Sequence, residues 1–321
     1  MAHIALSRPL LEDGLTALRG AHTVHVHDPP AEAEAAEDHL IAIAQEAQCR
    51  VTTVDDPVTE RVIDACQHLP LIAQYGVGVD NIDLEAAAAR DIIVTNTPGV
   101  LTDATADFTW ALLMAVARHV TEADAFVRSG QFERWETTLL LGMELRGKTL
   151  GIVGLGRIGA AVARRALGFG MHVVYHNRRR ANPTVEREQS ATYVPLDTLL
   201  ATSDVVSLHC PLNEDSRHLI GANALRAMKE SALLINTARG PVVNEAALVE
   251  ALAAGEIAGA GLDVFEREPE VHPGLIDQER VVLAPHLGSA TTEARTRMGE
   301  MVAEAVLAVL SHAEEVPYRV R

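Results

Sequence analysis

The chain has 321 residues, 48% of them hydrophobic and 22% charged, and its formal net charge is −17. This length favours two domains, and the composition is that of an ordinary soluble globular enzyme. The acidic balance argues against nucleic acid as a partner, because binding to phosphates requires a cationic surface.

The N-terminal part of the chain alternates between expected strands and expected helices. Strands are predicted over 3–7, 23–27, 71–75 and 92–95, and helices over 9–18, 31–47 and 83–90. Such alternation predicts βαβ units and a parallel sheet. Pro98-Gly99 then provides a turn signal and a candidate hinge.

A long apolar helix is predicted over 102–118, followed by a loop that contains Trp135. A second series of strands is expected over 149–153, 172–176, 205–209, 232–236, 258–263 and 281–283, and a last helix over 291–311. The crossings between the two series fall near residues 100 and 287. They predict a nucleotide-binding domain, 100–287, inserted into a substrate domain formed by 1–99 and 288–321.

Cysteine usage and apolar runs indicate where the protein works. Cys49, Cys66 and Cys210 form no Cys-x-x-Cys pair, so we expect reduced thiols in a cytoplasmic protein. The first ten residues lack a signal pattern, and no apolar run approaches the roughly 20 residues that span a bilayer, so no membrane partner is expected. His25 and His27 would share one face of a strand, where we favour edge-strand polar residues over a metal site. No metal is predicted.

The segment from Gly154 to Gly159 reads Gly-x-Gly-x-x-Gly between a predicted strand and a predicted helix. This context is typical of dinucleotide binding, and a glycine-rich turn in an ordinary α/β protein is the alternative. Gly154 would allow the tight turn, Gly156 would let the backbone approach a pyrophosphate, and Gly159 would let the helix pack on the strand. The N–H groups at the start of the helix would then face the phosphates.

The end of the next predicted strand indicates which dinucleotide is preferred. An Asp or Glu there usually binds the ribose hydroxyls of NAD, but this chain has Asn177 followed by Arg178, Arg179 and Arg180. Guanidinium groups suit a 2′-phosphate through planar, charge-assisted hydrogen bonds. We therefore expect NADP(H) to be preferred over NAD(H). The alternative is a solvated basic loop that tolerates both cofactors.

Three separated residues follow three successive predicted strands. Arg239 lies in Asn-Thr-Ala-Arg-Gly, Glu268 precedes Pro269, and His286 follows Pro285. Each could have a structural role alone, as an ion-pair partner, a turn element or a buried ring. Open α/β sheets, however, bind their ligands at the carboxyl ends of the strands. An Arg, a carboxylate and a His that converge there would suit reduction of a 2-oxo acid.

Several segments make the chain resemble the D-isomer-specific 2-hydroxyacid dehydrogenase family over nearly its whole length. They are the glycine motif and residues 75–83 (YGVGVDNID), 209–212 (HCPL), 236–240 (NTARG), 263–269 (DVFEREP) and 285–289 (PHLGS). The resemblance implies an α/β fold of two Rossmann-like domains, a flavodoxin-like substrate domain and a Rossmann nucleotide-binding domain, with the active site in the cleft. It also implies a homodimer built through the nucleotide-binding domain.

The resemblance also implies the roles of the strand-end residues. Arg239 would bind the substrate carboxylate and polarise the carbonyl, and His286 would protonate the carbonyl oxygen as hydride arrives from the nicotinamide. Glu268 would hold the imidazole and raise its pKa, because a nearby negative charge favours the protonated ring. Backbone N–H groups of Val77 and Gly78 would hold the substrate carboxylate.

Further cofactor contacts are implied along the nucleotide-binding domain. The full set is Thr105, Gly154, Gly156, Arg157, Ile158, Gly159, Asn177, Arg178, Arg179, Cys210, Pro211, Ser216, Thr237, Ala238, Asp263, His286 and Gly288. Arg157 and Ile158 would contact the pyrophosphate, and Asp263 would lie near the nicotinamide amide. Cys210 is not expected to be a catalytic thiol, because no activating base is patterned beside it.

Within the family, residues 97–107 (TPGVLTDATAD) are most similar to the NADPH-dependent glyoxylate/hydroxypyruvate reductases. Val54 would sit over the third carbon of such a substrate. Trp135 would border the active site, with a loop anchor as the alternative. Two further alternatives stay open, namely another D-2-hydroxyacid dehydrogenase, acting on a bulkier 2-oxo acid or on phosphoglycerate, and a cofactor-sensing corepressor of the same fold. Turnover of hydroxypyruvate would separate an enzyme from a sensor.

Overall fold

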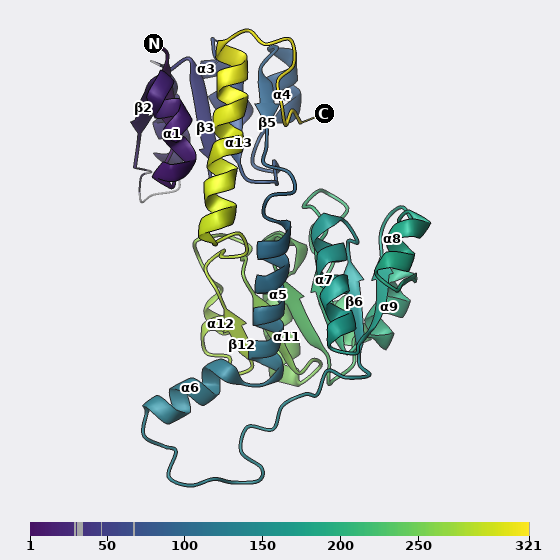
Figure 1. The fold of residues 1–321 in the computed structure, drawn as a ribbon. Helices are drawn as coiled ribbons and strands as arrows, with labels where there is room; N and C mark the ends of the chain where they lie inside the picture. The colour runs from purple at the N-terminus through teal and green to yellow at the C-terminus, as the bar shows by residue number, and fades with distance from the viewer. Residues whose placement is uncertain (29, 31–34, 46, 67, 321) are drawn as a thin grey trace. The chain divides into compact units, whose positions relative to one another are not determined.

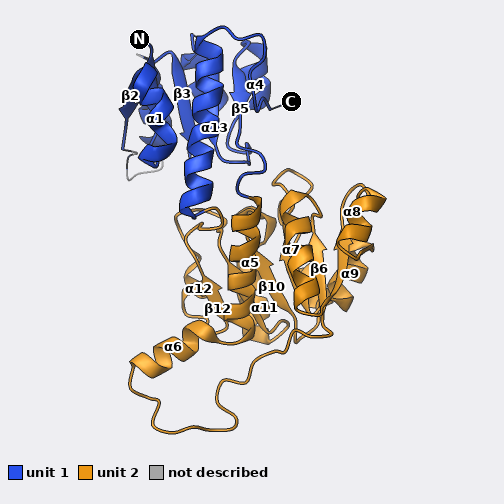
Figure 2. Ribbon diagram, in the orientation of Figure 1, with its two compact units in different colours: residues 1–101, 290–321 blue, residues 102–289 orange. Residues whose placement is uncertain are grey.

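The computed structural model describes residues 1–28, 30, 35–45, 47–66 and 68–320. The chain divides into two compact units, which are coloured separately in Figure 2. Unit 1 combines residues 1–101 with residues 290–321, and unit 2 consists of residues 102–289. No helix in the described part of the chain is both long and apolar enough to cross a membrane.

Unit 1 is built on a parallel five-stranded sheet with the order β2-β1-β3-β4-β5. This is the flavodoxin-like strand order. Its strands are β1 (His3–Leu6), β2 (Thr23–Val26), β3 (Cys49–Thr53), β4 (Leu71–Tyr75) and β5 (Ile93–Thr95). Its helices are α1 (Glu12–Ala21), α2 (Ala36–Ala44), α3 (Glu60–Ala65), α4 (Leu84–Ala89) and α13 (Thr292–Leu310).

The C-terminal helix α13 completes unit 1 by packing on elements from the start of the chain. It contacts α1 and β4, and Figure 1 shows it beside α1. Gly14 and Gly299 let the two helices approach closely, because a Cβ on Gly299 would lie 2.8 Å from the Cα of Gly14. On the other side of the sheet, α2, α3 and α4 cover a core that includes Ile63 and Ile72.

Unit 2 contains a parallel seven-stranded sheet with the order β12-β11-β10-β9-β6-β7-β8, which is the Rossmann order with one strand added. Its strands are β6 (Thr149–Val153), β7 (His172–His176), β8 (Ala191–Tyr193), β9 (Val205–Leu208), β10 (Leu233–Asn236), β11 (Gly259–Leu262) and β12 (Val281–Leu283). Its helices are α5 (Thr102–Ala117), α6 (Val120–Arg128), α7 (Arg157–Gly168), α8 (Pro183–Glu188), α9 (Leu196–Thr202), α10 (Ala222–Ala227), α11 (Glu245–Ala254) and α12 (Pro273–Ile276), with a 3-10 turn η2 (Gly240–Val242).

Helices cover both faces of the seven-stranded sheet. α5 and α7 pack together over one apolar core, which includes Leu113 and Ile152, and α9, α10 and α11 cover a second core, which includes Leu234 and Leu248. Both faces of the strands are therefore apolar, as parallel strands require. The expected α/β architecture is confirmed.

Some elements were not expected from the sequence. Strand β3 contains Arg50, which is fully buried. Its guanidinium donates hydrogen bonds to the carbonyl of Leu40 and, at 3.4 Å, to the thiol of Cys66, and these bonds offset the cost of burying it. Helix α6 begins after His119, whose φ of 53° ends α5 in the left-handed region. The expected helix over 31–47 lies partly outside the described residues, and its described part contains α2.

The histidines near the edge strand contact other histidines. His25 lies on β2, at the edge of the five-stranded sheet, and its Nε2 is 3.1 Å from Nδ1 of His3. The His27 ring meets the His39 ring edge to face. Burial, and then the neighbouring positive groups, lower the pKa of His27. His25 therefore lies on an edge strand as expected, whereas His27 follows the last residue of that strand.

Candidate active site

The strand-end residues Arg239, Glu268 and His286 all lie in unit 2, at one edge of its sheet. Arg239 follows β10, Glu268 lies in the loop after β11, and His286 follows β12. These three strands are neighbours in the sheet, and all run parallel. Their carboxyl ends therefore bring an Arg, a carboxylate and an imidazole to the same edge, where α/β sheets bind ligands.

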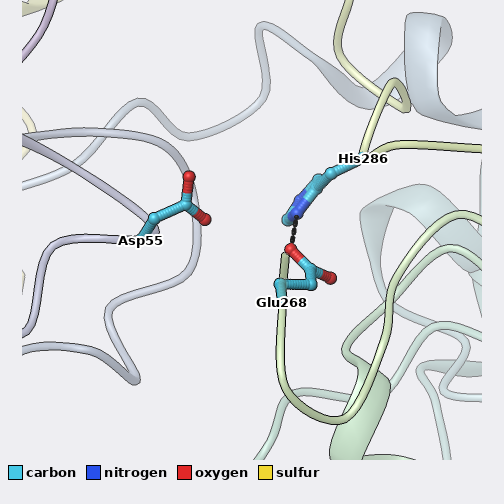
Figure 3. Close-up of side chains that lie close together, drawn as sticks. All are labelled: Asp55, Glu268 and His286. Carbon is cyan, nitrogen blue, oxygen red and sulfur yellow. Dashed lines mark hydrogen bonds and ion pairs between the residues drawn. The ribbon is translucent and has the colours of Figure 1, made fainter. Parts of the chain in front are cut away.

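Glu268 and His286 form a direct hydrogen bond, with Nδ1 of the ring 2.7 Å from Oε2 of the carboxylate (Figure 3). The other carboxylate oxygen accepts a bond of 2.9 Å from the backbone N–H of Phe265, which fixes its orientation. Burial of His286 acts to lower its pKa, and the charge of Arg239 acts in the same direction. The hydrogen bond and charge of Glu268 outweigh them, so the pKa of His286 is raised.

Asp263 holds the turn that presents the imidazole. Its carboxylate accepts bonds from the backbone N–H of Leu287, at 2.6 Å, and of Gly288, at 2.7 Å, and its carbonyl accepts from the N–H of His286 at 2.8 Å. These bonds hold His286 at a φ of 54°, a conformation that L-residues adopt rarely. Asp263 is 1% exposed, and burial raises its pKa to about 6 despite the two N–H donors.

The side chain of Asn236 shapes the loop that carries Arg239. It accepts a bond of 3.0 Å from the N–H of Ala238 and donates one of 2.9 Å to the carbonyl of Arg239. The half-buried guanidinium of Arg239 donates to the carbonyl of Ala238 at 2.8 Å. A short polar residue at the end of β10 thus fixes the backbone from which Arg239 projects.

The glycine motif forms the expected turn between β6 and α7. Gly154 has a φ of 102°, and a Cβ there would lie 2.6 Å from the backbone nitrogen of Cys210. A Cβ on Gly159 would lie 2.2 Å from the carbonyl oxygen of Gly154, so only glycine lets α7 pack this closely. Gly156 differs, because a Cβ there would meet no atom within 4 Å. The backbone at Gly156 is therefore open to a phosphate at the N-terminus of α7.

The residues after β7 divide into three kinds. Asn177 accepts a bond of 2.7 Å from the N–H of Leu155 and so holds the glycine loop. Arg178 and Arg179 are exposed, and Arg178 forms a surface ion pair of 3.1 Å with Asp215. Arg180 instead forms two bonds, of 2.7 and 3.0 Å, with the carboxylate of Glu186 on α8. These bonds, together with that from Tyr175, lower the pKa of Glu186 to about 2.

Comparison with known proteins identifies the chain. The family model described as "D-isomer specific 2-hydroxyacid dehydrogenase, NAD binding domain" matches residues 110–288. The chain belongs to this family. The expected family is confirmed, and the dehydrogenase is an NAD(P)-dependent oxidoreductase.

Relatives of this dehydrogenase match it over most of its length. The glyoxylate reductase of Thermococcus litoralis is 49% identical over 310 residues, which cover 95% of this chain and 92% of that protein. A crystal structure from Thermus thermophilus has a TM-score of 0.91 and 45% identity, and the match covers 99% of this chain and 100% of that chain. The NADPH-dependent glyoxylate/hydroxypyruvate reductase of Sinorhizobium meliloti, in complex with NADP and malonate, has a TM-score of 0.86 and 34% identity, covering 100% and 99%.

The remaining expected cofactor residues of the dehydrogenase cluster at the carboxyl edge of its unit 2 sheet. Ser216 donates a bond of 2.7 Å to the carbonyl of Pro211 and so closes the loop after β9. Burial raises the pKa of Cys210 in this loop to about 11, so its thiol is protonated near neutral pH. The hydroxyls of Thr109 and Thr237 are 2.8 Å apart, which joins α5 to the loop after β10.

The expected substrate contacts Val54, Val77 and Gly78 all lie in unit 1, after the carboxyl ends of β3 and β4. All three are half-buried, and the carbonyl of Val77 accepts a bond of 2.8 Å from the side chain of Asn96. Trp135 is 77% exposed in the loop that follows α6, so it is not an anchor within its own unit. Figure 1 shows α6 and this loop extending away from the sheet of unit 2.

Sequence reasoning missed the residues that support the site. It placed Asp263 near the nicotinamide and did not predict its bonds to the 286–288 backbone. Glu245 and Glu266 were also missed, although each accepts a bond from the backbone N–H of the other, at 2.7 and 3.1 Å. A carboxylate at the end of an apolar strand is the signal that could have indicated the structural role of Asp263. No local pattern connects Glu245 to Glu266.

Proposed function

We propose that this dehydrogenase reduces small 2-oxo acids, glyoxylate and hydroxypyruvate, to 2-hydroxy acids of D configuration where the product is chiral. Hydride comes from NADPH, and His286 donates the proton. The observation that carries the proposal is the 2.7 Å bond between Nδ1 of His286 and Glu268, at the strand edge that also carries Arg239. The glyoxylate reductase of Thermococcus litoralis supports the choice of substrate.

The proton transfer is assigned to one ring atom. Because Nδ1 of His286 faces Glu268, the Nε2–H of the imidazolium is the proton that reaches the substrate carbonyl oxygen. Glu268 stays ionised and stabilises the imidazolium, while Arg239 binds the substrate carboxylate and polarises the carbonyl. In our proposal the backbone N–H groups of Val77 and Gly78 also hold the carboxylate, and Val54 and Trp135 border the substrate.

The residues of unit 2 fit a dinucleotide. The open backbone at Gly156 and the N-terminus of α7 provide N–H donors for a pyrophosphate, with Arg157 and Ile158 beside them. When bound, the nicotinamide supplies the hydride, and the protein supplies position and field. We propose that Thr105, Cys210, Pro211, Ser216, Thr237, Ala238, Asp263 and Gly288 also contact the cofactor.

We further propose that NADP(H) is preferred over NAD(H). No carboxylate follows β7 at the position of Asn177, and the exposed Arg178 and Arg179 are able to turn toward a 2′-phosphate. The NADP complex of the relative from Sinorhizobium meliloti supports this choice. We also propose that unit 2 is the nucleotide-binding domain and unit 1 the substrate domain. The two units meet at 101/102 and 289/290, each two residues after the boundaries 99/100 and 287/288 expected from the sequence. A cytoplasmic location and a homodimer complete the proposal.

A substrate panel tests the proposed function. Purified enzyme is assayed with glyoxylate, hydroxypyruvate and bulkier 2-oxo acids, each with NADPH and with NADH. His286→Ala should lower kcat by at least about 100-fold, the usual contribution of a general acid, whereas His172→Ala, at an exposed position, should not. If His286→Ala keeps kcat near wild type, the assigned proton donor is wrong. NADPH binding without turnover of any acid would instead favour a cofactor sensor.

A further inference from the structure

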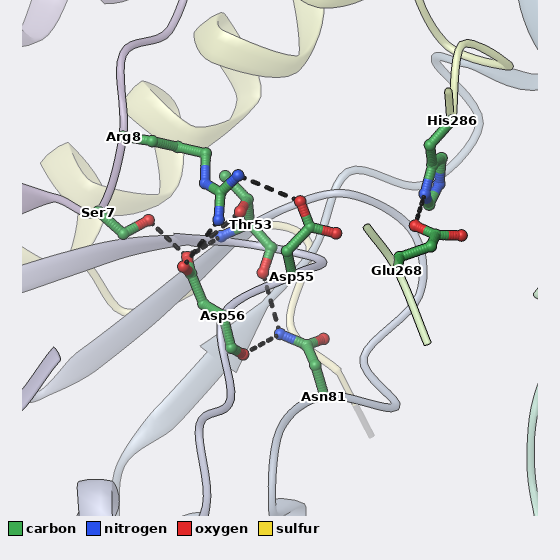
Figure 4. Close-up of polar contacts among 8 residues, drawn as sticks. All are labelled: Ser7, Arg8, Thr53, Asp55, Asp56, Asn81, Glu268 and His286. Carbon is green, nitrogen blue, oxygen red and sulfur yellow. Dashed lines mark hydrogen bonds and ion pairs between the residues drawn. The ribbon is translucent and has the colours of Figure 1, made fainter. Parts of the chain in front are cut away.

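A continuous polar network in unit 1 joins the two loops that we propose contact the substrate. One loop, 53–56, carries Val54, and the other, 76–81, carries Val77 and Gly78. Asn81 connects them, because its side-chain amide donates to the carbonyl of Thr53 at 3.0 Å and to that of Asp56 at 2.8 Å (Figure 4). Both of its N–H donors are therefore used.

Gln74 fixes the orientation of that amide. Its Nε2 donates to Oδ1 of Asn81 at 2.8 Å and to the carbonyl of Gly78 at 3.2 Å, while its Oε1 accepts from the hydroxyl of Thr52 at 2.7 Å. Gln74 and Thr52 are both 0% exposed, so each missing bond would leave a buried polar group unpaired. A flipped Asn81 amide would place its oxygen against two carbonyl oxygens, and the network excludes this orientation.

The side chain of Asp56 closes the network on the other side. Its Oδ2 accepts from the N–H of Thr53 at 2.6 Å and from the hydroxyl of Ser7 at 2.5 Å, and Arg8 lies 3.5 Å from its Oδ1. Asp56 is 3% exposed, so this turn is fixed from within unit 1. The loop of Val54 is thus held by Ser7 and Arg8, directly after β1, and by Asn81, in the loop after β4.

Val54 lies directly against the second loop. A Cβ on Gly76 would be 2.7 Å from Cγ1 of Val54, so the valine side chain occupies the space that a larger residue at position 76 would fill. Any shift of loop 53–56 therefore changes where Val54 lies relative to the N–H groups of Val77 and Gly78. The side chain of Asn81 bonds to loop 53–56 from loop 76–81.

We infer that Asn81, oriented by Gln74, is a positioning residue that sets both affinity for the 2-oxo acid carboxylate and selectivity for its third carbon. It acts by holding Val54 at a fixed distance from the Val77 and Gly78 N–H groups. Glyoxylate has no third carbon, whereas hydroxypyruvate has one. Selectivity between them therefore depends on this distance. The inference rests on the proposed function of these loops.

Asn81→Asp tests this assignment with little change in shape. A carboxylate cannot donate to the carbonyls of Thr53 and Asp56, so loop 53–56 loses both bonds. We expect KM for hydroxypyruvate to rise about tenfold or more, with kcat within about threefold of wild type and Kd for NADPH unchanged. The ratio of kcat/KM for hydroxypyruvate to that for glyoxylate should fall. Asn81→Ala, which leaves no buried charge, should give the same pattern if the Asp variant folds poorly.

Asp83→Ala is the matched control. Asp83 caps α4 by accepting a bond of 2.9 Å from the N–H of Ala86, so its loss also destabilises unit 1 close to Asn81. It leaves the Asn81 network intact, and KM should stay at the wild-type value. An equal rise of KM in both variants would mean that loss of stability, not positioning, is the cause, and would overturn the inference.

Hydrogen exchange of the free enzyme separates this inference from the proposed function. In Asn81→Asp the amides of residues 53–56 and 77–79 should exchange faster than in wild type, whether or not a 2-oxo acid is turned over. Unchanged exchange in both loops would overturn the inference even if the wild type is an active reductase. Absence of turnover in the wild type would overturn the proposed function while exchange still reports on Asn81.

Discussion

At the residue scale, the proposed proton donor His286 and its partner Glu268 predict how reduction depends on pH. The raised pKa of His286 keeps the ring protonated up to a higher pH than an ordinary imidazole, and burial and Arg239 both oppose this. Reduction consumes that proton, so kcat/KM for reduction should fall as pH rises through the pKa of His286 in the free enzyme. Oxidation of the 2-hydroxy acid requires the neutral ring and should rise with pH over the same range.

Glu268→Gln is predicted to shift the fall of kcat/KM for reduction to lower pH. Removing the negative charge lowers the pKa of His286, so reduction should begin to fall at a lower pH than in the wild type. The measurement is the pH profile of kcat/KM with NADPH. Glu270→Gln, at an exposed residue of the same loop, is the control and should leave the profile in place. Equal profiles for wild type and Glu268→Gln would contradict the role of Glu268.

The arginines after β7 provide a second prediction at this scale. Arg179→Ala should raise KM for NADPH about 10- to 100-fold and leave KM for NADH nearly unchanged, because a charge-assisted bond to phosphate contributes about 1.5–3 kcal/mol. Arg180→Ala should leave the cofactor preference alone, since Arg180 is bonded to Glu186, and should lower the melting temperature instead. If Arg180→Ala abolishes the preference and Arg179→Ala does not, the assignment of the phosphate ligand is wrong.

At the element scale, the backbone of the turn after β10 is in close contact with the backbone of the loop after β11. A Cβ on Gly240 would lie 1.8 Å from the carbonyl oxygen of Phe265, so the backbone directly after Arg239 touches the backbone three residues before Glu268. The reciprocal bonds of Glu245 and Glu266 hold the same two segments, and the Glu266 carboxylate also lies 2.5 Å from Nε2 of His218. The close backbone contact and these bonds therefore fix the spacing of Arg239 and Glu268.

Gly240→Ala should disrupt this arrangement. Because the methyl group meets backbone and not a flexible side chain, the loops must separate, and we expect kcat to fall at least about 100-fold while NADPH still binds. Gly168→Ala is the matched control, because a Cβ at Gly168, in α7, meets no atom within 4 Å. Assays of kcat and of NADPH fluorescence on both variants decide the matter. Wild-type kcat in Gly240→Ala would contradict the coupling of the loops.

What the sequence could predict at this scale depends on how locally each element is encoded. β4 was predicted at its observed bounds, because it is a mostly apolar run between Pro70 and Gly76. β3 was missed because Arg50 interrupts its apolar run, and only its distant contacts with Leu40 and Cys66 allow it to be buried. α6 was missed although its apolar side chains recur at helical spacing, and none of its residues is buried.

The candidate site was likewise predictable only where its residues follow locally encoded strands. Arg239, Glu268 and His286 follow strands that read clearly, and parallel strands end at a common edge. The bonds that hold them were not predictable, because Asp263 acts on a turn more than twenty residues away, as its bond to Gly288 shows. Glu245 and Glu266 are similarly distant, 21 positions apart in the sequence. Candidate catalytic residues could thus be proposed from local patterns, whereas the residues that support them depend on tertiary structure.

At the scale of the whole molecule, exposed apolar side chains on α6 and the following loop favour the proposed homodimer. α6 has no buried residue. The large apolar side chains exposed there are Val120, Val127, Phe132, Trp135 and Leu141. A surface of this kind on one segment is typical of a protein–protein contact. Each copy also carries a formal net charge of −17, so two copies repel, and association must come from apolar contact.

These two opposing forces predict how the oligomer responds to salt and to mutation. Sedimentation should show a dimer that is more stable at high ionic strength, because salt screens the repulsion and leaves apolar contact in place. Val127→Glu combined with Phe132→Glu should yield a monomer that still binds NADPH. Ile276→Glu, at a 63% exposed residue of α12, is the matched control and should remain dimeric.

Trp135 distinguishes the two roles that this segment can have. If Trp135 borders a substrate, Trp135→Ala should raise KM for hydroxypyruvate in a protein that is still dimeric. If its indole only contributes to the contact between copies, the same variant should weaken the dimer, and KM should follow the monomer fraction. Measuring KM over a range of enzyme concentrations separates these outcomes, because only the second depends on concentration. A dimer with unchanged KM would exclude Trp135 from both roles.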